Sequence, residues 1–275
     1  MCTTFSIITP CLNAEKTIGE TNRSVISQQG RFRIQYIIVD GGSSDKTREI
    51  INDYSASVLS PAIRRMNAGV TVTPVFEPDK GMYEALTKGF SKASGDIIAY
   101  INADDFYLPG AFDAVQHAFS CHPDVQWLSG IISVYNSDGA FRYCYTPFVY
   151  KSQYIRKGLY NGIVFPFVPQ ENTFWRAGLM GQINLKRLGS YQLAGDYYLW
   201  HEFSKHAQLY HLQSKLAGFR IYPDQKSAEK KKYRNELKKI ASLKITFKDL
   251  GALLIHKIMW HLPASIKHRY HKYMI

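Results

Sequence analysis

Clusters of acidic and hydroxyl side chains follow four apolar segments of this 275-residue chain. The segments occupy residues 5–10, 35–40, 70–77 and 96–103, and the polar clusters lie at 9–13, 40–45, 77–81 and 102–105. Carboxylates that gather with hydroxyls and glycines suit a diphosphate held through a hard divalent cation. The other common phosphate site, a G-x-x-x-x-G-K-[ST] loop, does not occur in the sequence.

The elements that must position these clusters alternate along the chain. The four apolar segments predict strands, and helical patterns predict helices at 15–29, 44–57 and 82–93 and after Pro109. This βαβ alternation predicts a mostly parallel sheet with helices on both faces. Ligands of such sheets bind beyond the carboxyl ends of the strands, so we expect the four clusters to share one acidic crevice.

The pattern changes in the second half of the chain. Residues 127–136 and 140–146 flank a Ser-Asp-Gly turn and predict a hairpin, and a helix is expected over 196–206. Trp175 and Trp200 fall within apolar helical spacing and are expected in the core. We expect this half to complete the sheet and to shape a second cleft.

Four motifs, taken together and in order, resemble those of family-two glycosyltransferases with the GT-A fold. They are FSIITPCLNAEKTI, IIVDGGSSDKT, EPDKGMYEALTKGFSKASGDIIAYINADD and AGDYYLW. The similarity spans about residues 4–225 and is strongest to bacterial surface-polysaccharide enzymes of the colanic-acid type. It implies an α/β GT-A domain at 1–225, with a nucleotide-sugar-binding half at 1–105, an acceptor half at 106–225 and a helical tail at 226–275.

The resemblance also implies roles for individual residues. Asp196 matches the catalytic base, and Asp104 matches the ligand of a divalent cation, Mn²⁺ or Mg²⁺. The residues that match donor-binding positions, for a nucleotide sugar that is most simply UDP-linked, are Thr9, Pro10, Asn13, Asp40, Asp79, Lys80, Asn102 and Asp105. Gln170 and Glu171 fall where relatives place acceptor-facing residues, and ordinary loop polarity explains them equally well.

Several positions depart from the family pattern. Asn102 stands where many relatives have Asp, which leaves more of the cation binding to Asp104. Gly41 replaces a second Asp, and Leu86-Thr87 replaces Arg-Asn, so a phosphate-facing arginine must come from another segment or be absent. Tyr222 occupies a place where relatives often have His. No Q-x-x-R-W motif follows Asp196, which argues against processive polymer synthesis.

The implied reaction is a single displacement, which predicts inversion at the anomeric carbon. Asp196 lies at the start of an expected helix, whose positive end favours the ionised carboxylate. We therefore expect a weak general base. Taken alone, Asp196 and Asp104 would be ordinary helix caps or turn residues, and the accompanying motifs are what raise the functional interpretation.

Three other functions fit parts of the sequence. A sugar nucleotidyltransferase shares the sheet but typically has a glycine-rich loop after the first strand, where this chain has TPCLNAEKT. A nucleic-acid-binding module would use a basic tail, but this tail lacks interleaved aromatic residues and the crevice is acidic, so no nucleic acid is expected. A catalytically weak nucleotide-sugar-binding scaffold remains open because Asn102 weakens the cation site.

Basic residues concentrate in the tail. Residues 226–275 hold 13 Lys and Arg against 3 acids, while the rest of the chain holds 21 against 19. The side chains that share one apolar arc of a helix ending before Pro263 are Phe247, Leu250, Gly251, Leu254, Ile255, Ile258 and Leu262. This arc predicts a helix on an anionic membrane surface, and its alternative is packing of the arc on the domain. A membrane position would suit a lipid-linked saccharide acceptor in bacterial cell-surface polysaccharide synthesis.

Other features bear on location. The chain has four cysteines without a C-x-x-C pair, which predicts reduced thiols. No window approaches the roughly 20 apolar residues of a membrane span, and no signal peptide is recognisable. We expect a cytoplasmic protein that lies on the inner face of the cytoplasmic membrane if the tail binds lipid. His211 and its neighbouring histidines are expected on a solvated face.

Overall fold

A nine-stranded sheet forms the centre of the part of the chain that the computed structural model describes, residues 2–58, 60–222, 229–241, 245, 247–270 and 273–275. The strand order is β3-β2-β1-β4-β8-β6-β9-β5, and β7 pairs with β6. The strands are β1 (Thr3–Cys11), β2 (Phe32–Asp40), β3 (Val70–Phe76), β4 (Ile97–Tyr100), β5 (Phe106–Tyr107), β6 (Trp127–Asn136), β7 (Phe141–Tyr145), β8 (Thr173–Arg176) and β9 (Leu209–Ile221).

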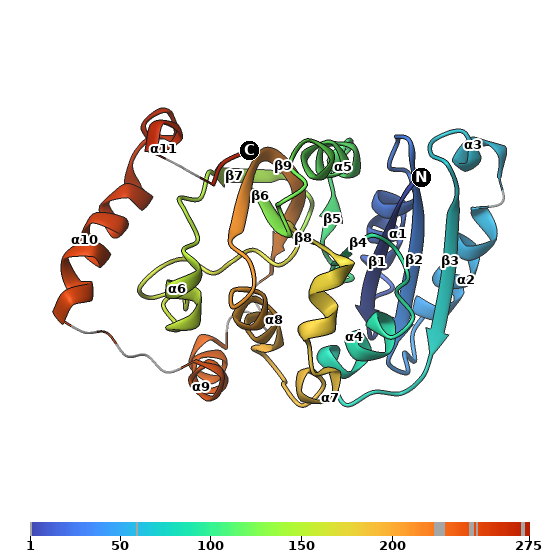
Figure 1. The fold of residues 1–275 in the computed structure, drawn as a ribbon. Helices are drawn as coiled ribbons and strands as arrows, with labels where there is room; N and C mark the ends of the chain where they lie inside the picture. Colours follow the sequence, from blue (N-terminus) through green and yellow to red (C-terminus); the bar gives the residue numbers. More distant parts are fainter. Residues whose placement is uncertain (1, 59, 223–228, 242–244, 246, 271–272) are drawn as a thin grey trace.

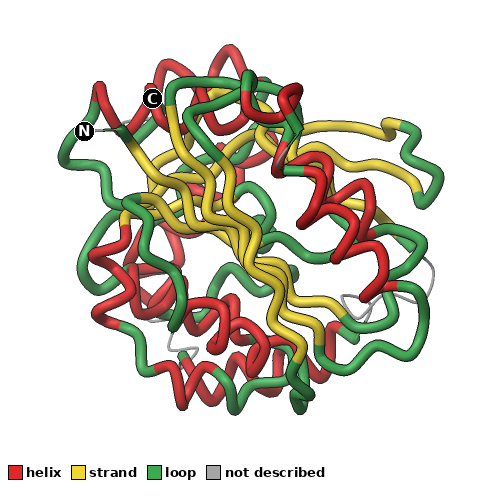
Figure 2. Tube along the Cα trace, turned by 90° about the vertical axis from the view of Figure 1, so that its right-hand side faces the viewer, coloured by secondary structure: helices red, strands yellow, loops and turns green. Residues whose placement is uncertain are grey.

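Helices cover both faces of this twisted sheet (Figures 1 and 2). They are α1 (Ile18–Ile26), α2 (Thr47–Ser57), α3 (Pro61–Arg64), α4 (Met82–Phe90), α5 (Ala111–Cys121), α6 (Ser152–Arg156), the 3₁₀ helix η1 (Ala177–Gln182), α7 (Leu185–Leu188), α8 (Gly195–Phe203), α9 (Lys230–Ile240), α10 (Phe247–His261) and α11 (Ala264–Tyr270). The predicted α/β fold with a mixed, mostly parallel sheet is confirmed.

The first four strands are parallel, as their sequence predicts. β1 pairs with β2 and β4, and β2 pairs with β3, all in parallel. Alternate residues of each strand point to opposite faces. Ile7 packs into the cluster with α1, α2 and α5, and its neighbour Ile8 packs into the cluster with α4 and α8. Strands buried on both faces explain the continuous apolar runs, and their carboxyl ends meet at one edge.

The second half extends the sheet through antiparallel and parallel pairs. β8 pairs antiparallel with β4 and β6, and the predicted hairpin is formed by β6 and β7. Trp175 and Trp200 are buried as predicted, with ring centroids 5.9 Å apart. The prediction for His211 is wrong, because its side chain is buried within β9 and Nδ1 lies 3.1 Å from the Ser129 carbonyl.

The tail helices contact the domain, and Lys267 of α11 donates to the Thr146 carbonyl at 2.9 Å. α9 packs beside α8, and α10 runs along the far side of α6 (Figure 1). Leu253, His256 and Trp260 of α10 are buried, and the His256 ring packs against Phe165 with centroids 4.8 Å apart. The sequence did not indicate this buried face. Within the described residues, no helix has the length and hydropathy needed to cross a membrane.

Candidate active site

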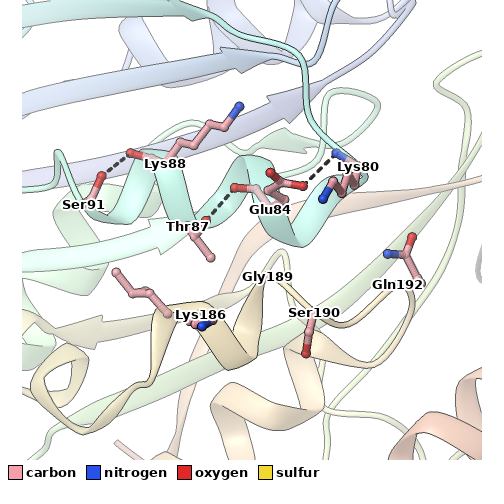
Figure 3. A pocket seen from close by; sticks show the side chains of 10 residues that line it. Lys80, Glu84, Thr87, Lys88, Ser91, Lys186, Gly189, Ser190 and Gln192 are labelled. Atoms are coloured by element: carbon pink, nitrogen blue, oxygen red, sulfur yellow. Dashed lines mark hydrogen bonds between the residues drawn. The ribbon is translucent and has the colours of Figure 1, made fainter.

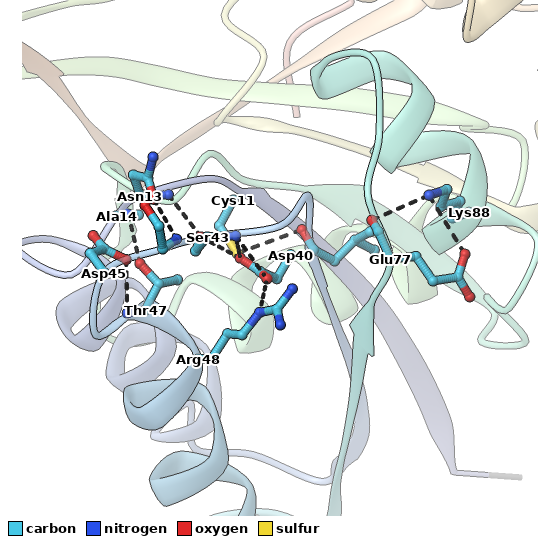
Figure 4. Close-up of polar contacts among 12 residues, drawn as sticks. Cys11, Asn13, Ala14, Asp40, Ser43, Asp45, Thr47, Arg48, Glu77 and Lys88 are labelled. Carbon is cyan, nitrogen blue, oxygen red and sulfur yellow. Dashed lines mark hydrogen bonds and ion pairs between the residues drawn. The ribbon is translucent and has the colours of Figure 1, made fainter.

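The loop that follows β2 is fastened to the carboxylate of Asp40 (Figure 4). Asp40 is fully buried, and its oxygens accept hydrogen bonds from the Ser43 backbone N–H at 3.2 Å and from the Ser43 hydroxyl. Arg48 Nε of α2 donates to Asp40 Oδ2 at 2.7 Å, and its guanidinium lies 5.4 Å from the centre of the Phe76 ring. Asp40 therefore organises the loop, and its predicted contact with a nucleotide base stays a prediction.

The loop after β1 meets the loop after β2. Asn13 has a positive φ of 50°, a conformation that Asn tolerates better than most residues. Its Oδ1 accepts from the Ser44 N–H at 2.9 Å, and its own N–H donates to Ser43 Oγ at 2.8 Å. Thr9 and Pro10 are buried, and Thr9 Oγ1 lies 3.0 Å from the Tyr36 hydroxyl, so Thr9 belongs to the interior.

Gly41 allows a third loop to join this side. A Cβ atom on Gly41 would lie 2.3 Å from Oδ2 of Asp79, closer than real Cβ contacts occur. The departure from Asp-Asp-Gly to Asp-Gly-Gly thus has a structural reason, because the Asp79 carboxylate occupies the space of the missing side chain. Asp79 Oδ1 accepts from the Gly81 N–H at 2.9 Å, and partial burial raises the Asp79 pKa. Burial raises the pKa of the Cys11 thiol, and the charges of Asp40, Asp79 and Asp45 raise it further, which identifies one acidic group at this edge.

A groove of about 660 Å³ lies beside these loops, between α4 and α7 (Figure 3). Lys80 lines it together with Glu84 and Lys88 from α4, and Lys186 and Gln192 face them from α7 and the following loop. The exposed Lys80 is held at its backbone, where its N–H donates to Glu84 Oε2 at 2.9 Å.

The loop after β4 carries a second acidic group. Asp105 is buried, and its Oδ1 accepts from the Arg220 N–H at 2.9 Å. The Arg220 guanidinium donates to the Asp104 carbonyl at 2.6 Å and pairs with Glu20 of α1. Burial raises the pKa of Asp104 and of Asp105. The negative charges of Asp104 and Glu171 raise the Asp105 pKa further. Leu86 stands where relatives carry an arginine, and its side chain is buried in the core. The arginines that contact the two acidic groups come from other segments: Arg48 contacts Asp40, and Arg220 contacts Asp104 and Asp105.

The residues of this second group fit a hard divalent cation. Asn102 Oδ1 and Asp105 Oδ2 are buried and accept no hydrogen bond from the described residues. With the Asp104 carboxylate they offer oxygen ligands, which Mg²⁺ and Mn²⁺ prefer. No cluster of three or more His, Cys, Asp or Glu side chains that could hold a metal forms among the described residues. Any cation here would therefore need further oxygen ligands, from a bound small molecule or from water.

Glu171 lies between the β4 loop and α8. It is buried, its Oε1 accepts from Asn172 Nδ2 at 2.9 Å, and burial raises its pKa to about 7. Its charge raises the pKa of Asp105, and the charge of Asp196 raises the pKa of Glu171. Gln170 instead donates to the Tyr100 carbonyl at 2.6 Å, which secures the end of β4. The two predicted acceptor residues thus have different environments, and Glu171 is the one beside the acidic groups.

Three groups surround one oxygen of Asp196. Oδ1 accepts from the Tyr197 N–H at 2.7 Å and from the Tyr233 hydroxyl at 3.1 Å. The Tyr83 hydroxyl lies 3.4 Å from Oδ1 and shares its proton with the Leu193 carbonyl, which is nearer at 2.9 Å. Among the described residues, none donates a hydrogen bond to Oδ2. Burial outweighs these bonds and raises the Asp196 pKa to about 6. The expectation of a weak base at a helix start is therefore wrong, because desolvation of the carboxylate is the larger effect.

Several residues of the site escaped the sequence analysis. Tyr83 lies within the motif that begins at Glu77, so its place in that motif could have identified it. Arg220 is far from Asp104 in the sequence, and the fold brings the two together. Tyr233 and Glu236 lie in the basic tail, whose charge predicts a surface position and not a place beside the crevice.

Comparison with known proteins is consistent with this geometry. Residues 6–180 match the model of glycosyl transferase family 2. A glycosyltransferase of Mycobacterium tuberculosis described as uncharacterised is 31% identical over 128 residues, which are 46% of this chain and 44% of the relative. A PGL/p-HBAD biosynthesis glycosyltransferase of Mycobacterium bovis is 32% identical over 102 residues, 37% of this chain and 35% of the relative. The chain spans less than half the length of the curated relatives it matches.

Solved structures share the fold. S. aureus TarS 1-349 in complex with UDP-GlcNAc superposes with a TM-score of 0.58 at 15% identity, covering 96% of this chain and 82% of TarS 1-349. Glucosyl-3-phosphoglycerate synthase from Mycobacterium tuberculosis, in complex with phosphoglyceric acid, superposes with a TM-score of 0.53 at 14% identity, covering 89% and 82%. At these identities the likeness is one of fold, the GT-A arrangement.

Proposed function

The chain belongs to glycosyl transferase family 2, and on that premise we propose that it moves one sugar from a UDP-sugar to an acceptor hydroxyl with inversion at the anomeric carbon. The observation that carries the proposal is the position of Asp196. Its half-buried carboxylate lies near Glu171, which in turn lies near the cation-compatible loop of Asp104 and Asp105. A base next to a diphosphate site is the arrangement that a single displacement requires.

A UDP-linked donor is supported by two features. TarS, which shares this fold, has been solved with UDP-GlcNAc and with UDP. The loops of Asp40 and Asp79 form a preorganised acidic edge, in which Gly41 lets the two loops touch. We assign residues 1–105 to the donor half and 106–225 to the acceptor half, with Asn13, Asp79 and Lys80 as donor contacts.

In the proposed reaction, the acceptor oxygen forms a bond to the anomeric carbon while the bond from that carbon to the diphosphate oxygen breaks. The acceptor proton passes to Oδ2 of Asp196, the oxygen that none of the described residues occupies with a hydrogen bond. A divalent cation held by Asp104, with Asn102 and Asp105 beside it, would neutralise charge on the departing diphosphate. A carboxylate with a pKa of about 6 is mostly ionised at neutral pH and still accepts a proton more readily than an exposed Asp.

The acceptor proposal is a lipid-linked saccharide at the cytoplasmic membrane. Its support is α10, where Leu250, Leu254, Ile255 and Ile258 are 51%, 62%, 66% and 53% exposed. This is the arc predicted from the sequence, and the opposite face, with His256, packs on the domain. Lys257 lies beside the arc and is exposed, and an apolar stripe with a basic neighbour suits an anionic lipid surface.

The test is release of nucleoside diphosphate from a panel of nucleotide sugars, with and without Mn²⁺. Wild-type protein should turn over one UDP-sugar in a metal-dependent manner. Asp104→Ala should lower that turnover about 100-fold or more, since loss of charge stabilisation at the leaving group commonly costs several kcal/mol. Asp124→Ala is the control, because it removes an exposed carboxylate outside the candidate site, and it should behave as wild type.

The alternatives predict different products. Release of pyrophosphate instead of UDP would indicate a nucleotidyltransferase. Binding of UDP-sugar without turnover, with metal and membrane lipid present, would overturn the transferase proposal in favour of a scaffold.

A further inference from the structure

Helix α9 of the tail lies against the start of α8, the helix that carries Asp196 (Figure 1). Its Tyr233 hydroxyl donates to Asp196 Oδ1 at 3.1 Å, and the Tyr233 ring packs edge-on against Phe167 with centroids 5.0 Å apart. The phenol is therefore fixed by packing on one side while its hydroxyl reaches the carboxylate.

Glu236, one turn later in α9, holds the backbone that leads into α8. Its carboxylate accepts from the N–H groups of Gln192 at 2.9 Å, Leu193 at 2.9 Å and Ala194 at 2.8 Å. The N-cap residue of α8 is Ala194, which has no side-chain oxygen to bond the helix start. A carboxylate near a helix N-terminus is also stabilised by the helix dipole. Glu236 thus fixes the loop immediately before Asp196 from a separate helix.

We propose that Tyr233 and Glu236 are positioning residues that aim Asp196 Oδ2 at the acceptor hydroxyl, so that the tail is part of the catalytic centre. This rests on the proposed role of Asp196 as general base. Since Tyr233, Tyr83 and the Tyr197 N–H all bond Oδ1, the carboxylate has one anchored oxygen and one oxygen left for the proton. The two residues lie outside the stretch 6–180 that matches the family model, so the family pattern does not assign them.

The charged and titratable groups around Asp196 come from several elements. Tyr83 faces it from α4, Tyr233 from α9 and Glu171 from the segment before β8. Tyr100 and Tyr197 also feel the Asp196 charge, and Glu236 acts on Tyr83. Burial favours the protonated form of Asp196, and the hydrogen bonds from the Tyr197 N–H, from Tyr233, from Tyr83 and from its own backbone favour the ionised form. Loss of the Tyr233 hydroxyl should therefore raise the Asp196 pKa.

The test compares the pH dependence of UDP release by Tyr233→Phe with that of the wild type, with water as the acceptor and with the panel donor that turns over fastest. We expect the fall in rate at low pH, the acid limb of the pH–rate profile, to move to higher pH by about 0.5–1 unit. A shift of this size corresponds to the net free energy of one hydrogen bond to the charged form. The loss at pH 6 should exceed the loss at pH 8 by about threefold, since the base is half protonated near its pKa. Tyr143→Phe, an exposed tyrosine, is the matched control and should leave the limb in place.

Glu236 is tested by its effect on kcat against KM. Glu236→Ala should lower kcat about tenfold with donor KM unchanged, and Glu236→Gln, which keeps one acceptor oxygen, should lose less. The control is Glu229→Ala, because Glu229 of the same tail pairs only with Lys232 among the described residues. Wild-type kcat in Glu236→Ala would overturn the assignment of this residue.

A second readout separates this proposal from the proposed function. Carbon-13 NMR of protein labelled at Asp carboxyls gives the Asp196 pKa directly, with its signal assigned from its absence in Asp196→Asn. An unchanged pKa and acid limb in Tyr233→Phe would overturn the positioning role of Tyr233 even if Asp196→Asn is inactive. Full turnover by Asp196→Asn would instead overturn the base itself.

Discussion

The donor side and the base side of the crevice are held by different kinds of contact. On the donor side, Asp40 is bound by Ser43 and Arg48, which lie 3 and 8 residues further along the chain. On the base side, Asp196 is bound by Tyr83, 113 residues earlier, and by Tyr233, 37 residues later. The first set is a loop that organises itself, whereas the second exists only when three helices are packed together.

This difference implies that donor binding and proton transfer can be separated. Local hydrogen bonds within one loop persist when distant parts of the chain move, while a side chain held from α4 and α9 depends on the packing of both. Changes on the base side should therefore act on turnover with little effect on donor affinity. Changes on the donor side should do the reverse.

The largest expected effect is that of Asp196→Asn. Removing the general base should lower kcat about 10²–10⁴-fold, while the Kd for UDP, measured by calorimetry, should stay within about twofold of wild type. The base acts as the carboxylate, so wild-type turnover should fall as the pH drops through about 6, the Asp196 pKa, and should be level above it. The residual activity of the Asn variant should lack this limb.

Loss of UDP affinity in Asp196→Asn, in parallel with kcat, would remove the proposed separation. An acid limb that persists in the variant would assign the titration to another group, of which Glu171 is the candidate because its pKa is about 7.

A smaller effect, on affinity instead of turnover, is expected for Gly41→Asp. The Cβ of the new side chain would lie 2.3 Å from Asp79 Oδ2, and its carboxylate would add a charge of the same sign. Overpacking of this kind costs about 1–3 kcal/mol, so the Kd for UDP should rise about five- to a hundredfold, with kcat at saturation changed less. Gly178→Asp is the control, because no atom lies within 4 Å of its Cβ position. Unchanged affinity would show that the Gly41 contact does not shape the donor site.

The parallel half of the fold was predictable because its signal is local. Apolar runs such as 35–40 form strands in any packed α/β domain, and strand ends must share one edge. The acidic clusters at Asp40 and Asp104 follow directly from that rule. The reason for Gly41 was not predictable, because it depends on how closely the β3 loop approaches the β2 loop.

The base side escaped prediction for a physical reason. A helix-start Asp has a lowered pKa in water, and only the depth of burial reverses the sign for Asp196. Part of the surroundings of Asp196 comes from α9, through Tyr233, and α9 is so rich in lysine that its sequence indicates a solvated or lipid-facing surface. Tyr233 and Glu236 are among its partly buried residues, spaced three apart on one helical face.

The smallest expected effect concerns α10, and it tests whether the tail serves the base through α9 alone. Leu254→Glu combined with Ile258→Glu places two charges in the exposed arc, so sedimentation with phosphatidylglycerol-containing vesicles should weaken about three- to tenfold. UDP release without lipid should not change, because these side chains face away from the domain. Phe141→Glu with Tyr143→Glu adds the same charge at exposed positions on β7 and should leave vesicle binding intact. If wild-type protein does not sediment with these vesicles at low salt, the membrane proposal fails. If instead the α10 variant loses turnover in the absence of lipid, α10 supports the catalytic base as well, and the base side extends further into the tail than α9.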